Sequence, residues 1–181
     1  MHHRAKKSAE RLVSHIDLSG IRRVLDVGGG SGVYSMAFAR AKAGLTAVVF
    51  DLPRVTELAR KYIDEAGLSA CITTLDGDYN TDDFGTGYDL VFMSAIVHIN
   101  SCDENAALMA RAFRSLNPGG VIVIQDHIME NDRTAPVRGA LFALNMLVNT
   151  RSGDTFTEEE MRQWLEKAGC VDIKRIPTGM E

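Results

Sequence analysis

Short apolar runs alternate with longer amphipathic segments along this chain, and that alternation constrains the fold most strongly. Six segments rich in strand-forming residues lie at 21–27, 45–51, 71–75, 88–93, 121–126 and 170–176. Several of them, such as VLDV, TAVVF and VIVI, are almost continuously apolar, which is typical of strands covered on both faces of a parallel sheet. Helical signals lie between them, at 31–43, 53–66, 103–116 and 157–168. The pattern predicts an α/β fold with an open, mainly parallel sheet and helices on both faces.

Size and composition narrow the class of protein. The 181 residues suit a single domain, predicted to span 1–181, and the 45% hydrophobic and 24% charged residues exclude a disordered, collagenous or coiled-coil chain. No apolar run approaches the roughly 20 residues of a membrane helix. The net charge of −4 gives no basic field for nucleic acid. The three scattered cysteines favour neither a disulfide framework nor a zinc site, so we expect a cytoplasmic protein without a bound metal.

Two segments depart from the alternation, and one helix start is marked clearly. Residues 1–17 form a basic amphipathic helix candidate before the first strand. Residues 134–150 form an apolar helix candidate inserted after the fifth strand. Thr157 and Glu160 have the spacing of a capping box, in which each side chain satisfies the other residue's free backbone amide at a helix start.

The first strand runs into a glycine loop, VLDVGGGSG, and then into a helix. Glycines allow backbone conformations with positive φ and let a ligand approach the main chain closely. A dinucleotide fingerprint would require G-x-G-x-x-G, but Val33 stands where its third glycine belongs. Asp26, just before Gly28 and Gly30, is unfavourable beside a pyrophosphate and suits a cationic amino-acid group. The loop therefore predicts a ligand other than a nicotinamide dinucleotide.

Acidic residues also end the next two strands. Asp51 lies near the offset from the loop at which a carboxylate meets ribose hydroxyls. Asp78 follows the third strand, where it can accept a hydrogen bond from an adenine amine, with Tyr79 or Leu52 flanking the ring. Each carboxylate alone is compatible with a solvated strand end, but three at consecutive strand ends beside a glycine loop predict a nucleoside-like ligand.

The motifs DVGGGSG, FDLP, DGD and LNPGG resemble class I S-adenosylmethionine-dependent methyltransferases. More narrowly, VLDVGGGSG with FDLPRV and HINSCDENAALM resembles the bacterial and plant small-molecule O-methyltransferases. The resemblance implies a Rossmann-like fold and S-adenosylmethionine as cofactor, leaving as S-adenosylhomocysteine. It also implies that the methionine end of the cofactor contacts Asp26, Gly28 and Gly30. The remaining predicted cofactor contacts are Asp51, Leu52, Asp78, Tyr79 and Ser94, although plant members carry a Lys where Ser94 stands.

His98 follows the fourth strand, and in the resembled family a His at this place is the general base. A carboxylate that fixes its tautomer and stabilises the imidazolium would assist it. Asp126, at the end of the fifth strand, and Asp154, after the 134–150 helix, are the two candidates. The family usually has Glu at both places, and plant members read His-Asp-Trp where this chain has His98-Ile99-Asn100.

The 134–150 segment places Phe142, Asn145, Met146 and Asn149 on one helix face. Amides on a buried stripe are costly unless they are hydrogen-bonded. We expect either a substrate pocket with Phe142 and Met146 as walls, or an interface.

The leading hypothesis is O-methylation of a small aromatic, hydroxylated metabolite. The alternatives are a cofactor-binding relative that has lost methyl transfer, and an N- or C-methyltransferase of a small molecule. A nicotinamide-dependent oxidoreductase is disfavoured by Val33 and Asp26, and a protein or RNA methyltransferase by the acidic charge.

The length carries expectations of its own. The resembled family usually has an additional N-terminal dimerisation domain, expected to be absent from this chain, and a final antiparallel strand, expected to be truncated. We therefore expect the full-length protein to be a homodimer. This chain would be a monomer or weak dimer that acts on a small molecule, with no nucleic-acid or membrane partner.

Overall fold

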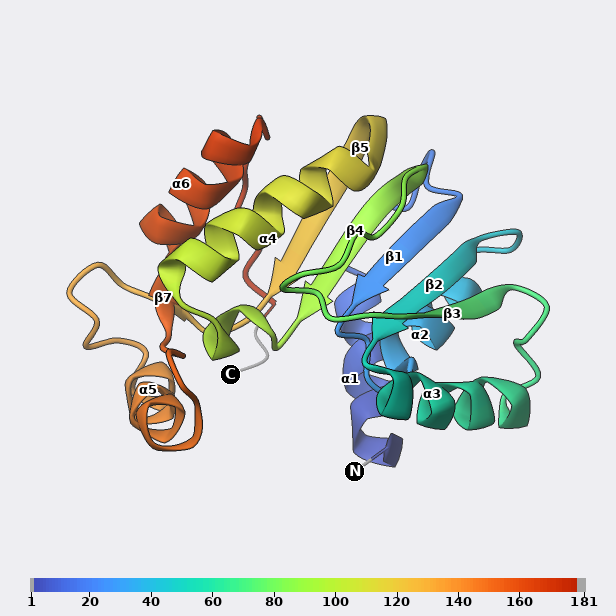
Figure 1. Ribbon diagram of the computed structural model, residues 1–181, viewed down its shortest axis with the longest axis horizontal. Coiled ribbons are helices and arrows are strands. Elements are labelled where there is room, and N and C mark those ends of the chain that lie inside the picture. The colour runs from blue at the N-terminus through green and yellow to red at the C-terminus, as the bar shows by residue number, and fades with distance from the viewer. Residues whose placement is uncertain (1, 179–181) are drawn as a thin grey trace. The chain divides into compact units, whose positions relative to one another are not determined.

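The computed structural model describes residues 2–178, with side chains from residue 6 onward (Figure 1). The chain forms two compact units. The described residues up to Met93, together with Ser115–Val123, make up the first unit, and Ser94–Arg114 with the described residues from Ile124 onward make up the second.

The first unit holds the sheet. Along the chain come α1 (His2–Val13), β1 (Arg23–Val27), α2 (Val33–Ala41), β2 (Thr46–Asp51), α3 (Pro53–Glu65), β3 (Ile72–Asp76), β4 (Tyr88–Ser94) and most of β5 (Leu116–Gln125). The strand order is β3-β2-β1-β4-β5, and the pairs β1–β2, β1–β4 and β2–β3 are parallel. The predicted α/β fold with an open, mainly parallel sheet is confirmed.

Burial explains why these apolar runs become strands. Val24, Leu25 and Val27 of β1 are fully buried, as are all four residues from Leu90 to Met93 in β4. Such continuous burial requires cover on both faces of the sheet. Helix α2 packs against β1 and β2, α3 packs against β2 and β3, and α1 packs on α2. The parallel pairing places the carboxyl ends of β1, β2, β3 and β4 at one edge, where ligands of open α/β sheets bind.

The second unit contains the short 3₁₀ helix η1 (Val97–Ile99), α4 (Cys102–Ser115), β6 (Ile128–Met129), α5 (Val137–Asn149), β7 (Phe156–Thr157) and α6 (Glu158–Ala168). The two-residue strands β6 and β7 pair in parallel. The predicted capping box at the start of α6 is confirmed, because Thr157 and Glu160 satisfy each other's backbone amides. The predicted helices at 1–17 and 134–150 form over His2–Val13 and Val137–Asn149.

The predicted strand at 170–176 is wrong. This segment has no strand within the described part of the chain, and Val171 and Ile176 are 81% and 56% exposed. The carbonyl oxygen of Ile173 accepts hydrogen bonds from the guanidinium of Arg162, both at 3.3 Å. A side chain of α6 therefore binds this backbone in place of a neighbouring strand.

Candidate active site

The glycine loop connects β1 to α2 in the first unit. Gly28 extends the β1–β2 pairing by donating its N–H to the carbonyl of Phe50 at 2.8 Å. A Cβ on Gly29 would lie 2.8 Å from Cγ of Asp26, so a larger residue cannot occupy this position without displacing that carboxylate. Gly30 has a φ of +57°, and the space beside its Cα is open. The loop thus exposes bare backbone at the carboxyl edge of the sheet, as a close-lying ligand would require.

Asp26 lies beneath this loop and is 1% exposed. Its Oδ2 accepts hydrogen bonds from the Ser35 hydroxyl at 2.8 Å and the Ser35 N–H at 3.2 Å. Its Oδ1 is buried and has no hydrogen-bond partner in the described protein. Desolvation raises the pKa of Asp26 to about 7, against the opposing effect of the Ser35 bonds. Asp26 is therefore a strong acceptor with one oxygen unsatisfied.

Asp51 ends β2 and is bound to the same loop. Its Oδ2 accepts a hydrogen bond from Gly30 N–H at 2.9 Å, and its Oδ1 accepts one from Leu52 N–H at 2.8 Å. The carboxylate remains half-buried rather than enclosed, and Leu52 beside it is 50% exposed. The loop and the end of β2 therefore form one connected element of the site.

Asp78 and Tyr79 follow the end of β3. Asp78 is exposed, and its Oδ1 accepts from Asn80 N–H at 2.8 Å while its own N–H donates to Asp82 Oδ2 at 2.9 Å. Tyr79 is half-buried. The first unit thus brings the predicted cofactor residues of β1, β2 and β3 to one sheet edge. Ser94 belongs to the second unit, where its hydroxyl donates to Gln125 Oε1 at 2.5 Å.

His98 and Asp126 form a dyad in the second unit. His98 Nδ1 lies 2.7 Å from Asp126 Oδ1, and the two side chains are 11% and 2% exposed. The same carboxylate accepts from His127 N–H at 2.8 Å, which fixes its orientation. Asn105 holds η1 in place by donating to the carbonyl of Val97 at 2.9 Å. When Nδ1–H donates to the carboxylate, Nε2 carries the lone pair and can accept a proton.

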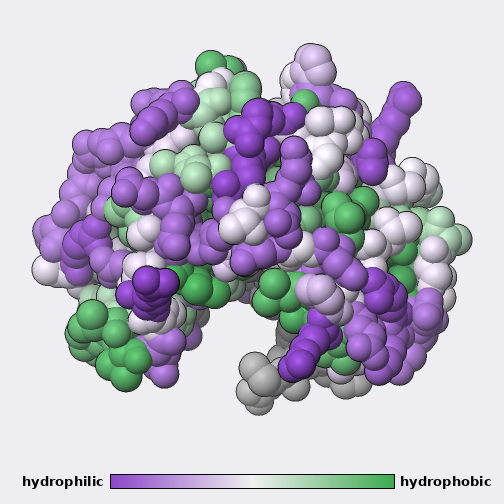
Figure 2. Space-filling view, viewed as in Figure 1, coloured by the Kyte–Doolittle hydropathy of each residue, from purple (hydrophilic) through white to green (hydrophobic). Residues whose placement is uncertain are grey.

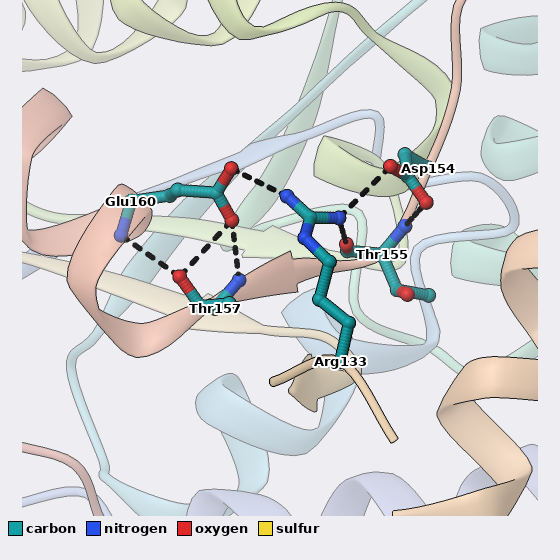
Figure 3. A network of polar contacts seen from close by, with 5 residues as sticks. All are labelled: Arg133, Asp154, Thr155, Thr157 and Glu160. Atoms are coloured by element: carbon teal, nitrogen blue, oxygen red, sulfur yellow. Dashed lines mark hydrogen bonds and ion pairs between the residues drawn. The ribbon is translucent and has the colours of Figure 1, made fainter. Parts of the chain in front are cut away.

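The carboxylate of Asp154 is directed elsewhere (Figure 3). Its Oδ2 lies 2.9 Å from Arg133 Nη1, and its Oδ1 accepts from Thr155 N–H at 2.8 Å. Arg133 also pairs with Glu160 at 2.6 Å. Asp154 reaches His98 only through its backbone, whose N–H donates to the His98 carbonyl at 3.1 Å. Of the two predicted partners, the structure brings Asp126 and not Asp154 to the imidazole.

Helix α5 brings Phe142 to the dyad. The Phe142 ring meets the His98 ring edge-on, with centroids 4.8 Å apart, and the His127 ring at 4.6 Å. Met146 is buried, as expected for a wall. The expectation of buried amides is wrong, because Asn145 and Asn149 are exposed and bind each other through Asn149 Nδ2 and Asn145 Oδ1 at 2.6 Å.

A pocket of about 340 Å³ lies on the face of α5 that contains Phe142. Its lining residues are His127, Arg138, Leu141, Phe142 and Asn145. The sequence alone predicts no site role for His127, Arg138 or Leu141. Arg138, Leu141, Phe142 and Asn145 recur at helical spacing, and that signal identifies them as one face once Phe142 is placed in a site.

The chain matches known proteins over most of its length. A sequence profile for the family described as an O-methyltransferase domain matches residues 1–171. The chain is 36% identical over 169 residues to 3-hydroxy-5-methyl-1-naphthoate 3-O-methyltransferase of Streptomyces sahachiroi, covering 93% of this chain and 49% of that protein. It is 39% identical over 132 residues to L-tyrosine C(3)-methyltransferase of Streptomyces lavendulae, covering 73% of this chain and 36% of that protein.

A solved structure shares the fold as well. The human N-acetylserotonin methyltransferase in complex with S-adenosylmethionine superposes with a TM-score of 0.85 at 27% identity, covering 94% of this chain and 48% of that one. The chain spans about half the length, or less, of the curated relatives that it matches. Within the described residues, no helix is long and apolar enough to cross a membrane.

Proposed function

Because the chain belongs to the O-methyltransferase family, we propose that it binds S-adenosylmethionine and deprotonates the hydroxyl group of a small aromatic acceptor, which then takes the methyl group. The observation that carries this proposal is the enclosed His98–Asp126 pair, at 2.7 Å. The first two relatives described above act, by their names, on an aromatic acid and an aromatic amino acid. A hydroxylated aromatic acceptor agrees with both.

The residues of the first unit fit the cofactor. The open space beside Gly30 leaves room against the backbone, and Asp26 Oδ1 is a buried acceptor that lacks a partner, as an ammonium group or its bound water would require. Asp51 would accept from ribose hydroxyls, while Asp78, Tyr79 and Leu52 would surround the adenine. When bound, S-adenosylmethionine supplies a methyl group on a positively charged sulfur.

His98 would act as the general base. Its Nε2 takes the proton of the acceptor hydroxyl, and Asp126 stabilises the imidazolium that results. A phenol of pKa about 10 is almost entirely protonated at neutral pH, so this proton transfer is worth roughly 10²–10⁴-fold in rate. Phe142 and Met146 would form walls beside the acceptor. Ser94 and Gln125 would support the end of β4.

Methyl transfer from labelled S-adenosylmethionine to a panel of phenols tests the proposal. His98→Ala should lower kcat by roughly 10²–10⁴-fold while S-adenosylhomocysteine binds with unchanged affinity. His15→Ala, remote in sequence and outside the dyad, is the matched control and should behave as the wild type. Full turnover by His98→Ala would reject His98 as the base. Failure of the wild-type chain to bind S-adenosylhomocysteine at millimolar concentration would reject the cofactor assignment.

We further propose a cytoplasmic protein without nucleic-acid or membrane partners. The support is compositional. Cys71, Cys102 and Cys170 are all free thiols, which suits a reducing compartment. The net charge of −4 disfavours binding to nucleic acid.

A further inference from the structure

The pocket on α5 has a definite chemical character. Leu141 and the Phe142 ring offer apolar walls, and the remaining lining residues are His127, Arg138 and Asn145. Arg138 is the fixed charge among the five, and no acidic side chain belongs to the lining. The pocket is an open hollow of about 340 Å³, and its Arg138, Leu141 and Asn145 side chains are exposed, so a ligand would lie against the surface of α5.

The polar groups of this pocket have spare hydrogen-bonding capacity. Within residues 6–178, no ion pair of Arg138 is found. Asn145 uses its side-chain oxygen to accept from Asn149, which leaves its own amide N–H groups to donate. The nearest carboxylate in sequence to His127 is Asp126, and that group is already held by His98 Nδ1 and His127 N–H. Arg138 is therefore a cation without an ion-pair partner among the described residues, and the Asn145 amide and the His127 ring can each donate a hydrogen bond.

The pocket and the dyad both contact one ring, that of Phe142. Phe142 lines the pocket and lies edge-on to the His98 ring at 4.8 Å between centroids. An aromatic ligand against Phe142 and Leu141 would have its polar substituent beside Arg138. A guanidinium binds a carboxylate through two parallel N–H···O bonds, a geometry that neither a hydroxyl nor an amide reproduces.

We propose that the acceptor carries a carboxylate, and that Arg138 selects hydroxyarenecarboxylates over neutral phenols of the same shape. This inference rests on the proposed function, since it names the class of acceptor for that site. Arg138 is a specificity-determining residue in this account. His127 and Asn145 donate to the same carboxylate.

Titration calorimetry with a matched pair of probes tests the inference. 3-Hydroxybenzoate and 3-hydroxybenzamide have nearly the same shape and differ in the charge of one substituent. With saturating S-adenosylhomocysteine present, no turnover occurs. The wild-type chain should bind the acid about tenfold more tightly than the amide, as expected for a partly exposed charge-assisted pair. Arg138→Gln should remove that preference by weakening acid binding and leaving amide binding unchanged.

Two further variants sharpen the result. Arg138→Lys should retain part of the preference, because it keeps the charge but loses the planar fork. Arg40→Gln, an exposed arginine on α2, should bind both probes as the wild type does. Equal binding of acid and amide by the wild type would overturn the inference. A preference for the acid that survives in Arg138→Gln would overturn it as well. So would the absence of acid binding to the wild type at concentrations up to about 10 mM.

The outcomes separate this inference from the proposed function. An Arg138-dependent preference for the acid without any methyl transfer would uphold the pocket's selectivity and reject the activity. Methylation of acid and amide with equal kcat/KM, unaffected by Arg138→Gln, would uphold the activity and reject the selectivity.

Discussion

The buried carboxyl of Asp26 should make the ligand-free protein less stable as the pH rises. Its pKa is raised from 3.8 to about 7 in the folded state, chiefly because burial removes it from water. A group whose pKa is higher in the folded than in the unfolded state makes its full contribution to stability at pH values below its pKa in the unfolded state. That contribution is lost as the pH rises through the folded value. The window therefore runs from about pH 4 to about pH 7.

The size of the effect follows from the same values. At about 1.4 kcal/mol for each tenfold change in proton affinity, the rise from 3.8 to about 7 corresponds to at most roughly 4 kcal/mol. Local relaxation and water penetration reduce the cost of a buried charge, so we expect about 1–3 kcal/mol. Asp26→Asn removes the titration but keeps an oxygen that can accept from Ser35. We compare the free energy of unfolding of Asp26→Asn with that of the wild type, both without ligand. Above pH 7, this difference should favour the variant by about 1–3 kcal/mol more than it does at pH 4.5.

Urea unfolding followed by circular dichroism, at several values between pH 4.5 and 8.5, measures this difference. Asp103→Asn is the matched control, because Asp103 is exposed on the first turn of α4 and should show the pH dependence of the wild type. The reasoning would be refuted by an Asp26→Asn variant whose stability relative to the wild type is the same at pH 5 and pH 8. A relative stability that falls with rising pH would refute it too.

Two further predictions concern the loop and α6. Gly29→Ala places a Cβ 2.8 Å from Asp26 Cγ, so it should cost about 1–3 kcal/mol of stability and weaken S-adenosylhomocysteine binding in calorimetry, while Ser31→Ala in the same loop should do neither. Thr157→Ala removes the side chain that accepts from Glu160 N–H, so urea unfolding should show a loss of about 1 kcal/mol, and a loss below a few tenths would contradict the capping role.

The apolar runs of β1 and β4 predict the sheet well because their burial and their sequence pattern have the same cause. Val24, Leu25 and Val27 of β1 and the residues from Leu90 to Met93 of β4 are covered on both faces, and that environment selects apolar residues. The glycine loop is equally readable, since its conformation depends on residues adjacent in sequence. His98 is predicted as a site residue from its place after β4 together with the family resemblance.

The choice between Asp126 and Asp154 is not readable from the sequence. Both contact His98: Asp126 through its side-chain carboxylate, and Asp154 through its backbone N–H. The competing partner of Asp154 is Arg133, which comes from a different loop and also binds Glu160. Only the three-dimensional structure settles such a competition between side chains.

The orientation of α5 is hidden in the sequence for a different reason. The helix is apolar around most of its circumference, so its pattern does not reveal which face packs inward. Val137, Leu141, Leu144, Leu147 and Val148 are exposed, and Figure 2 shows hydrophobic surface where α5 lies. Asn145 and Asn149 are exposed too, although the predicted helix face that contains them also contains the buried Met146.

A double-mutant cycle on His98 and Asp126 tests the central claim most directly. With kcat for methyl transfer as the readout, His98→Gln should lose roughly 10²–10⁴-fold and Asp126→Asn at least about tenfold. If Asp126 acts through the imidazole, adding Asp126→Asn to His98→Gln should cost nothing more. Losses that multiply in the double variant, or a His98→Gln variant with wild-type kcat, would contradict the account.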